Sequence, residues 1–443
     1  MSGNKRHSWA AGSGNALVIH PDLRQGGDRR RSADACLDEA RSLVEAIGLN
    51  VVGAEVVSLS RVRPATLIGQ GRIETLATQT AAEEIEVVVV DGQLSPVQQR
   101  NLERALSCKV IDRTGLILEI FAERARTREG RLQVELAQLT YQRSRLVRSW
   151  THLERQRGGL GTVGGPGETQ IEADRRMIDE RVVLLRRQLD DVIRTRNLHR
   201  RNRAAVPYPI VALVGYTNAG KSTLFNRLTD ATVFAHDQLF ATLDPTMRAL
   251  ILPSGRKVIL SDTVGFISEL PTHLVAAFRA TLEEVRDADL LLHVRDITHA
   301  DTEVQKQDVL QVLQSLEIDT ELEESAIEVL NKTDLADEIS KQQWRDLAAQ
   351  RDNLAVISAR SGDGVEQLLT VVDRWFDRRA QSFTVTVPAT DGATLAWLHR
   401  RGQVLEQAVD GDDIRLRVRL EEADASRLRK RIGAPSILAV AAE

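Results

Sequence analysis

Apolar and polar positions change their spacing several times along this chain, and each change predicts a different kind of structure. A short apolar run at residues 16–19 is followed by a helical pattern at 35–47, and apolar runs at 51–57 and 85–90 are followed by a helical pattern at 96–106. Strands that alternate with helices predict a small parallel α/β domain. The polar residues before position 15 lack periodic apolar positions, so we expect them to be disordered.

After residue 112 the pattern becomes that of long, highly charged helices. Apolar residues recur there at intervals of three, four and seven, which is typical of a helical seam. They are Leu132, Leu136, Leu139, Leu146 and Leu153 in one segment and Ile171, Ile178, Leu185, Leu189 and Val192 in the next. Residues 157–167 between them are too rich in glycine for a helix, at about 1 kcal/mol for each glycine. We expect an antiparallel helical hairpin with a flexible tip.

The strand and helix alternation resumes at residue 210. Apolar runs at residues 210–214, 258–260, 290–294, 327–330 and 354–357 predict a second parallel sheet. The predicted fold class is therefore α/β, with a second, larger parallel-sheet domain after the small domain and the hairpin.

Beyond residue 380 the chain predicts a small α+β tail, because residues 383–387 and 414–420 alternate as half-buried strands do. The expected domains are residues 1–130, 131–205, 206–380 and 381–443.

Composition adds few constraints. Hydrophobic residues make up 42% and charged residues 28%, and 59 Lys and Arg against 63 Asp and Glu leave a net charge of -4. Global charge therefore argues neither for nor against a nucleic-acid partner. Cys36 and Cys108 have no metal-ligand spacing, so we expect buried thiols in a reducing compartment. No stretch approaches the roughly 20 apolar residues of a membrane helix, and we expect a cytoplasmic protein.

A phosphate-binding loop is predicted where the strand at residues 210–214 gives way to a helix. The residues that match its pattern are Gly215, Tyr216, Thr217, Asn218, Ala219, Gly220, Lys221 and Ser222. Its glycines let the backbone wrap the phosphates, whose charge then faces amide groups and a helix N-terminus. Lys221 is expected to reach the β and γ phosphates, and Ser222 to bind Mg²⁺.

A second phosphate-side segment, Asp262, Thr263, Val264 and Gly265, ends the strand at residues 258–260. We expect Asp262 to support the Mg²⁺ site and Gly265 to reach the γ-phosphate with its N–H group. The position after Gly265, where many regulatory GTPases place a water-orienting glutamine, is Phe266. A phenyl ring cannot orient water, so we expect slow hydrolysis that a partner accelerates; an aromatic packed under this segment is an equally compatible interpretation.

The base is specified by Asn331, Lys332, Thr333 and Asp334, which follow the strand at residues 327–330. The Asp334 carboxylate can accept both N–H donors on the Watson–Crick edge of guanine, and adenine would leave it unpaired. Such a site can reject the wrong analogue by about 10⁴-fold, so the sequence favours GTP over ATP. Ser358, Ala359 and Arg360 close the last strand and are expected to offer an N–H group to the guanine O6.

Between these segments a switch with a hydroxyl group for Mg²⁺ and the γ-phosphate is expected. The candidate residues are Phe240, Ala241, Thr242, Leu243 and Asp244. Thr242 is the first choice; Thr246, or a structural role for the threonine, is the alternative. The predicted catalytic residues are Lys221, Thr242 and Gly265, and the predicted metal ligands are Ser222 and Thr242.

Taken with these motifs, residues 63–72, 112–114, 129–137 and 165–170 resemble signatures of the HflX GTPases. The resemblance covers nearly all of residues 16–380. It implies a GTPase whose N-terminal region and hairpin dock on the RNA and protein of the large ribosomal subunit, which stimulates hydrolysis and allows stalled ribosomes to be split or rescued. The chain departs from the expected pattern at Gly164, where many members carry an arginine, so a contact to RNA from that side chain is not implied here.

The arginines near the hairpin ends favour an RNA-rich partner independently, because guanidinium groups pair with phosphates. They include Arg155, Arg157, Arg194, Arg196, Arg200, Arg201 and Arg203. The expected partners are GTP or GDP and the large ribosomal subunit, with possible peripheral membrane association and a monomeric state. Two alternatives stay open. One is a nucleotide-gated RNA or membrane tether with incidental hydrolysis, and the other is an additional RNA-remodelling activity driven by an ATP site in the N-terminal domain, near Gly69 and Gly71.

Overall fold

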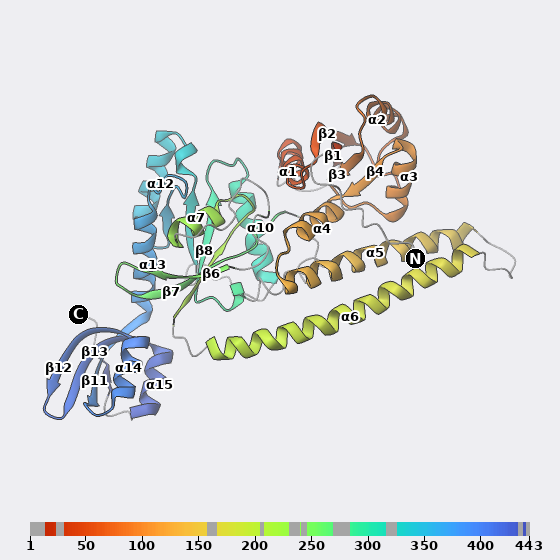
Figure 1. Cartoon of the computed structure of the whole chain (residues 1–443). Helices are drawn as coiled ribbons and strands as arrows, with labels where there is room; N and C mark the ends of the chain where they lie inside the picture. The colour runs from red at the N-terminus through yellow and green to blue at the C-terminus, as the bar shows by residue number, and fades with distance from the viewer. Residues whose placement is uncertain are drawn as a thin grey trace.

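The structure is a computed structural model with four successive parts (Figure 1). It describes residues 14–23, 31–156, 166–203, 208–229, 240, 246–268, 284–315, 326–432 and 437–439. Within these residues, no helix is long and apolar enough to cross a membrane.

The N-terminal part is a four-stranded parallel sheet in the order β2-β1-β3-β4. Its strands are β1 (Asn15–Leu23), β2 (Asn50–Leu59), β3 (Val87–Val90) and β4 (Lys109–Asp112), and its helices are α1 (Ala33–Glu45), α2 (Gln70–Ala82), α3 (Pro96–Leu106) and α4 (Arg113–Arg124). Successive strand residues point to opposite faces. Val18 and Val89 therefore pack with α1 and α4, whereas Leu17 and Val88 pack with α2 and α3.

A helical hairpin of α5 (Arg128–Gln156) and α6 (Pro166–Arg203) follows. Its seam contains the apolar residues Leu132, Leu136, Leu139, Leu185, Leu189 and Val192, as the spacing predicts. Asp112 ties the hairpin to the N-terminal sheet, because its carboxylate accepts hydrogen bonds from Tyr141 and Arg145 of α5. The expected glycine-rich tip lies outside the described residues, except for its last two positions, which belong to α6.

The third part is a six-stranded sheet in the order β10-β9-β8-β5-β7-β6. The strands are β5 (Ile210–Val214), β6 (Thr246–Ile251), β7 (Lys257–Asp262), β8 (Leu290–Asp296), β9 (Ala326–Asn331) and β10 (Leu354–Val356), and the long helices are α7 (Lys221–Thr229), α10 (Thr302–Ser315), α12 (Glu338–Gln350) and α13 (Val365–Arg379). All strands are parallel except β6, which pairs antiparallel with β7. The carboxyl ends of the parallel strands meet at one edge, where ligands bind in such sheets.

The C-terminal part is an antiparallel sheet in the order β12-β13-β11-β14. It contains β11 (Ala380–Pro388), β12 (Gln403–Asp410), β13 (Asp413–Glu421) and β14 (Ile437–Ala439), together with α14 (Gly392–Arg401) and α15 (Glu422–Ile432). Phe383, Val385 and Val387 of β11 are fully buried, as the alternating pattern predicts. β11 follows α13 without an intervening linker.

Candidate nucleotide-binding site

The phosphate loop joins β5 to α7, and its two glycines are required by close backbone approach. Gly215 has a φ of +147°, and a Cβ there would lie 2.2 Å from the carbonyl oxygen of Val294. Gly220 has a φ of +93°, and its Cβ would lie 2.2 Å from Nδ2 of Asn331. No other residue type fits without displacing these atoms.

Lys221, the first residue of α7, is buried under this loop. Its ammonium group donates hydrogen bonds to the carbonyl oxygens of Gly215, at 3.0 Å, and Tyr216, at 2.7 Å. Burial lowers the pKa of Lys221 to about 8, although the nearby Asp262 carboxylate acts in the opposite direction. The ammonium group of Lys221, which is predicted to bind the phosphates, therefore lies inside the loop.

Ser222 and Asp262 come together as expected for an Mg²⁺ site. The Ser222 hydroxyl donates a 2.8 Å hydrogen bond to the carboxylate of Asp262, which is fully buried at the end of β7. Oxygen donors of this type suit Mg²⁺, which takes one or two protein ligands plus substrate phosphates. The described residues contain no cluster of three His, Cys, Asp or Glu side chains that could hold a metal without such phosphates.

The segment after Asp262 lies directly on the phosphate loop. The N–H group of Phe266 donates to the carbonyl of Gly215 at 3.1 Å, and the N–H group of Thr217 donates to the carbonyl of Phe266 at 2.7 Å. A Cβ on Gly265 would lie 3.0 Å from Nζ of Lys221. The Phe266 ring is buried in the core, which agrees with the packing interpretation of this residue.

On the base side, Asn331 links two loops. Its amide nitrogen donates to the carbonyl of Ala219, and its amide oxygen accepts from the N–H group of Ala359, both at 2.8 Å. Asp334 is exposed and accepts a 2.7 Å hydrogen bond from the hydroxyl of Ser358. The motifs predicted to hold the base and the phosphates are therefore in direct contact.

Lys332 has a left-handed backbone conformation, with a φ of +67°, and its ammonium group forms a 2.8 Å ion pair with Asp296 at the end of β8. The other carboxylate oxygen of Asp296 accepts hydrogen bonds from the N–H group and hydroxyl of Thr298. Burial would raise the pKa of Asp296, but Lys332 and Thr298 hold it below its usual value. Asp296 is a base-side residue that the sequence motifs did not reveal.

Of the predicted switch, only part lies in the described chain. Phe240 is buried and meets Phe121 of α4 edge to face, with ring centroids 4.8 Å apart. Thr246, the alternative hydroxyl, begins β6 opposite Asp262. Ala241, Thr242, Leu243 and Asp244 lie outside the described residues.

Comparison with known proteins agrees with this geometry. Four family models match successive parts of the chain: "GTP-binding GTPase N-terminal" at residues 34–122, "GTP-binding GTPase Middle Region" at 124–203, "50S ribosome-binding GTPase" at 210–332 and "HflX C-terminal domain" at 344–439. A protein of Magnetococcus marinus named GTPase HflX is 52% identical over 92% of this chain and 94% of its own length. The chain belongs to the HflX family of GTPases.

The GTPase HflX of Escherichia coli is 43% identical over 94% of this chain and 95% of its own length. Among solved structures, a protein named SsGBP in complex with GDP is 23% identical and covers 83% of this chain and 99% of its own, with a TM-score of 0.49. As an HflX family member with a P-loop GTPase domain, the protein binds GTP and is a GTP hydrolase.

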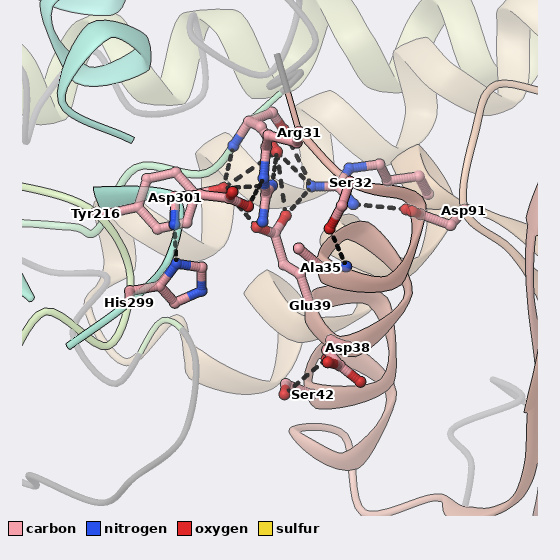
Figure 2. A network of polar contacts seen from close by, with 12 residues as sticks. Arg31, Ser32, Ala35, Asp38, Glu39, Ser42, Asp91, Tyr216, His299 and Asp301 are labelled. Atoms are coloured by element: carbon pink, nitrogen blue, oxygen red, sulfur yellow. Dashed lines mark hydrogen bonds and ion pairs between the residues drawn. The ribbon is translucent and has the colours of Figure 1, made fainter. Parts of the chain in front are cut away.

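Arg113 belongs to one of the HflX signature segments, but motif analysis gave it no role. The structure places it with Arg31 and Glu39 at the contact between the N-terminal part and the nucleotide site (Figure 2). A Cβ on Gly69 or Gly71 would meet no atom within 4 Å, so close packing does not require glycine at either position of the alternative ATP site.

Proposed function

We propose that this HflX protein is an Mg²⁺-dependent GTPase of the large ribosomal subunit that splits or rescues stalled ribosomes. The observation that supports the ribosomal partner is the match of residues 210–332, which contain the nucleotide site, to the family described as a 50S ribosome-binding GTPase. Residues 1–130, 131–205, 206–380 and 381–443 are proposed as its four domains.

The proposed chemistry is phosphoryl transfer to water. Ser222 and Thr242 would hold Mg²⁺, which supplies charge neutralisation at the β and γ phosphates when bound. Lys221 would stabilise charge on the same phosphates, and the N–H group of Gly265 would contact the γ-phosphate. Because Phe266 is buried and offers no polar group, the group that orients water is expected from the partner.

Exposed arginines on α6 support an RNA-containing partner. Arg175, Arg176, Arg186, Arg187 and Arg194 all face solvent on this helix. Acidic residues such as Asp190 and Asp191 are interspersed, which makes the helix a mixed surface rather than a uniformly basic one. Phosphate contacts of this kind weaken as salt rises.

Sedimentation with separated ribosomal subunits tests the partner. With a non-hydrolysable GTP analogue, the protein is expected to sediment with the large subunit and less so with GDP; large subunits should also accelerate phosphate release. Binding to the subunit without faster phosphate release would support the nucleotide-gated tether instead. If the subunit neither binds the protein nor accelerates phosphate release, the proposed ribosomal GTPase and a ribosome tether are both contradicted. A chain without residues 158–167 should keep its GDP affinity but lose sedimentation if the hairpin tip is the docking element.

A further inference from the structure

One side chain links the helix after the phosphate loop to the loop on the base side. Both belong to the third part of the chain, from β5 to α13, which we call the GTPase part. Arg227 lies in the last turn of α7, the helix that begins with Lys221 and Ser222. Its guanidinium group donates hydrogen bonds to the carbonyl oxygens of Ala359, at 2.6 Å, and Arg360. The helix that starts at the predicted phosphate site is therefore bonded to the loop predicted to meet the guanine O6.

The two carbonyl groups depend on Arg227. Among the described residues, no other group donates to the carbonyl oxygen of Ala359 or Arg360. A hydrogen bond from a charged donor is about twice as strong as one between neutral groups, and the planar guanidinium fork can serve two acceptors at once. The turn leaves room for this fork at Gly362, where φ is +95° and a Cβ would lie 2.8 Å from a guanidinium nitrogen of Arg227.

The direction of these carbonyl groups fixes the direction of the next N–H groups. In a planar trans peptide, the carbonyl group of one residue and the N–H group of the following residue point in opposite directions. The carbonyl group of Ala359 points to Arg227. The N–H group of Arg360 therefore points away from α7.

The N–H group of Arg360 is also the one in this loop that a ligand can use. The N–H group of Ala359 donates to the amide oxygen of Asn331 at 2.8 Å, and that of Ser361 donates to the hydroxyl of Ser358 at 3.0 Å. In the part of the chain that the structure describes, no group accepts from the N–H group of Arg360.

We propose that Arg227 is a positioning residue for guanine recognition: by holding the carbonyl groups of the 358–360 loop, it turns the N–H group of Arg360 toward the O6 atom of the base. The proposal rests on the proposed nucleotide site, in which this loop meets O6 and Asp334 accepts from the ring N–H and the exocyclic amine. Asp334 lies beside the loop, because it accepts a 2.7 Å hydrogen bond from the hydroxyl of Ser358. Two groups thus read the base, and only the N–H group depends on Arg227.

Analogues of GDP separate the two groups. In 6-thioguanosine diphosphate, sulfur, a weaker acceptor, replaces O6, whereas inosine diphosphate lacks the exocyclic amine that Asp334 is proposed to bind. In Arg227→Met, the preference for GDP over 6-thioguanosine diphosphate, measured by calorimetry, should fall by about fivefold, the factor for one hydrogen bond. The preference for GDP over inosine diphosphate should stay at the wild-type value.

Two further variants test whether the effect depends on these hydrogen bonds. Arg227→Lys keeps the charge but replaces the planar fork with one ammonium group, so its preference over 6-thioguanosine diphosphate should lie between those of the wild type and Arg227→Met. Arg345→Met is the matched control, because Arg345 also contacts this loop but pairs at 3.0 Å with the exposed side chain of Asp363. That variant should keep both preferences.

Hydrogen exchange gives a second readout at the backbone itself. In the wild-type protein, GDP should slow amide exchange in the peptide that contains Arg360, and Arg227→Met should lose most of this protection. Protection of the phosphate loop, residues 215–222, should remain in the variant at saturating GDP. Full protection of the Arg360 peptide in Arg227→Met would contradict the proposal.

Unchanged preferences in Arg227→Met would overturn the proposal. An equal loss of both preferences would also overturn it, because it would show a general loosening of the base site rather than a role at O6. If the wild-type protein does not prefer GDP to 6-thioguanosine diphosphate, the loop does not read O6 and the proposal fails. Failure of the wild-type protein to bind GDP at all would instead contradict the proposed nucleotide site.

Discussion

The base end and the phosphate end of the nucleotide site differ in which parts of the chain hold them. At the base end, Asn331 is hydrogen-bonded to Ala219 and Ala359, and Asp334 to Ser358. All of these residues belong to the GTPase part. At the phosphate end, Tyr216 and Ser268 are bonded to α1 and α4 of the N-terminal part. The contacts of the predicted base end therefore lie within the GTPase part, whereas the predicted phosphate end also contacts the N-terminal part.

The largest expected effect is at the base end. Asp334→Asn should weaken GDP binding by about 1000-fold or more, because the amide presents a donor where guanine also donates. Xanthine carries an oxygen in place of the exocyclic amine, so the same variant should gain affinity for xanthosine diphosphate. Calorimetry with GDP and with xanthosine diphosphate measures this change of base preference. Unaltered GDP affinity would show that Asp334 does not recognise the base.

A smaller effect is expected from the backbone support of the phosphate loop inside the GTPase part. In Gly215→Ala, the new Cβ would lie 2.2 Å from the Val294 carbonyl, so the free energy of unfolding should fall by about 3 kcal/mol or more. Thermal or denaturant unfolding gives the value.

Gly71→Ala in α2 is the matched control, since its Cβ meets no atom within 4 Å. Gly71 is the second residue of α2, where helix propensity counts for less than in a helix interior, so the free energy of unfolding should change by less than about 1 kcal/mol. Equal stability of the two alanine variants would show that the approach of Gly215 to Val294 carries no cost.

The smallest effect is expected for the ion pair of Asp296 at the base end, which should influence both nucleotides equally. In Asp296→Asn the ion pair to Lys332 is lost, and both GDP and the GTP analogue should bind about fivefold more weakly, near the upper range for a partly exposed pair. The ratio of the two affinities should stay at the wild-type value. Glu338→Gln on the exposed start of α12 serves as the control. A changed ratio would mean that the base end is coupled to the γ-phosphate.

Much of the fold was predictable because its signals are local. The alternation of strands and helices predicted the parallel α/β sheet, and the motif at residues 215–222 predicted that it is a P-loop GTPase sheet; the comparisons confirm this fold. The sequence did not predict β6, which is largely exposed, with Ile251 62% exposed, and therefore lacks a clear apolar alternation. It also gave no signal for α2, whose buried face has only Ile73, Leu76 and Thr80.

The site divides in the same way. Asn331 and Asp334 could be assigned to the base side of the site because their motif follows the phosphate loop and the Asp262 segment in the order typical of GTPases. Their roles stay predictions. Glu39 looks like any acidic residue on a helix surface, and only the tertiary fold brings it to Tyr216. A contact across 177 residues leaves no mark on the spacing of residues near either partner.

Because α13 ends at Arg379 and β11 begins at Ala380, the C-terminal sheet is joined directly to the last helix of the GTPase part. α13 has 15 residues, so its axis is about 22 Å long, and it begins shortly after the Ser358–Arg360 loop at the base end. Asp377 near its far end pairs with Arg256 of the GTPase part and Arg419 of β13. Leu368, Val372 and Phe376 of α13 are buried in the core of the GTPase part, so the helix is anchored along its length and fixes the C-terminal sheet to the GTPase part at this junction.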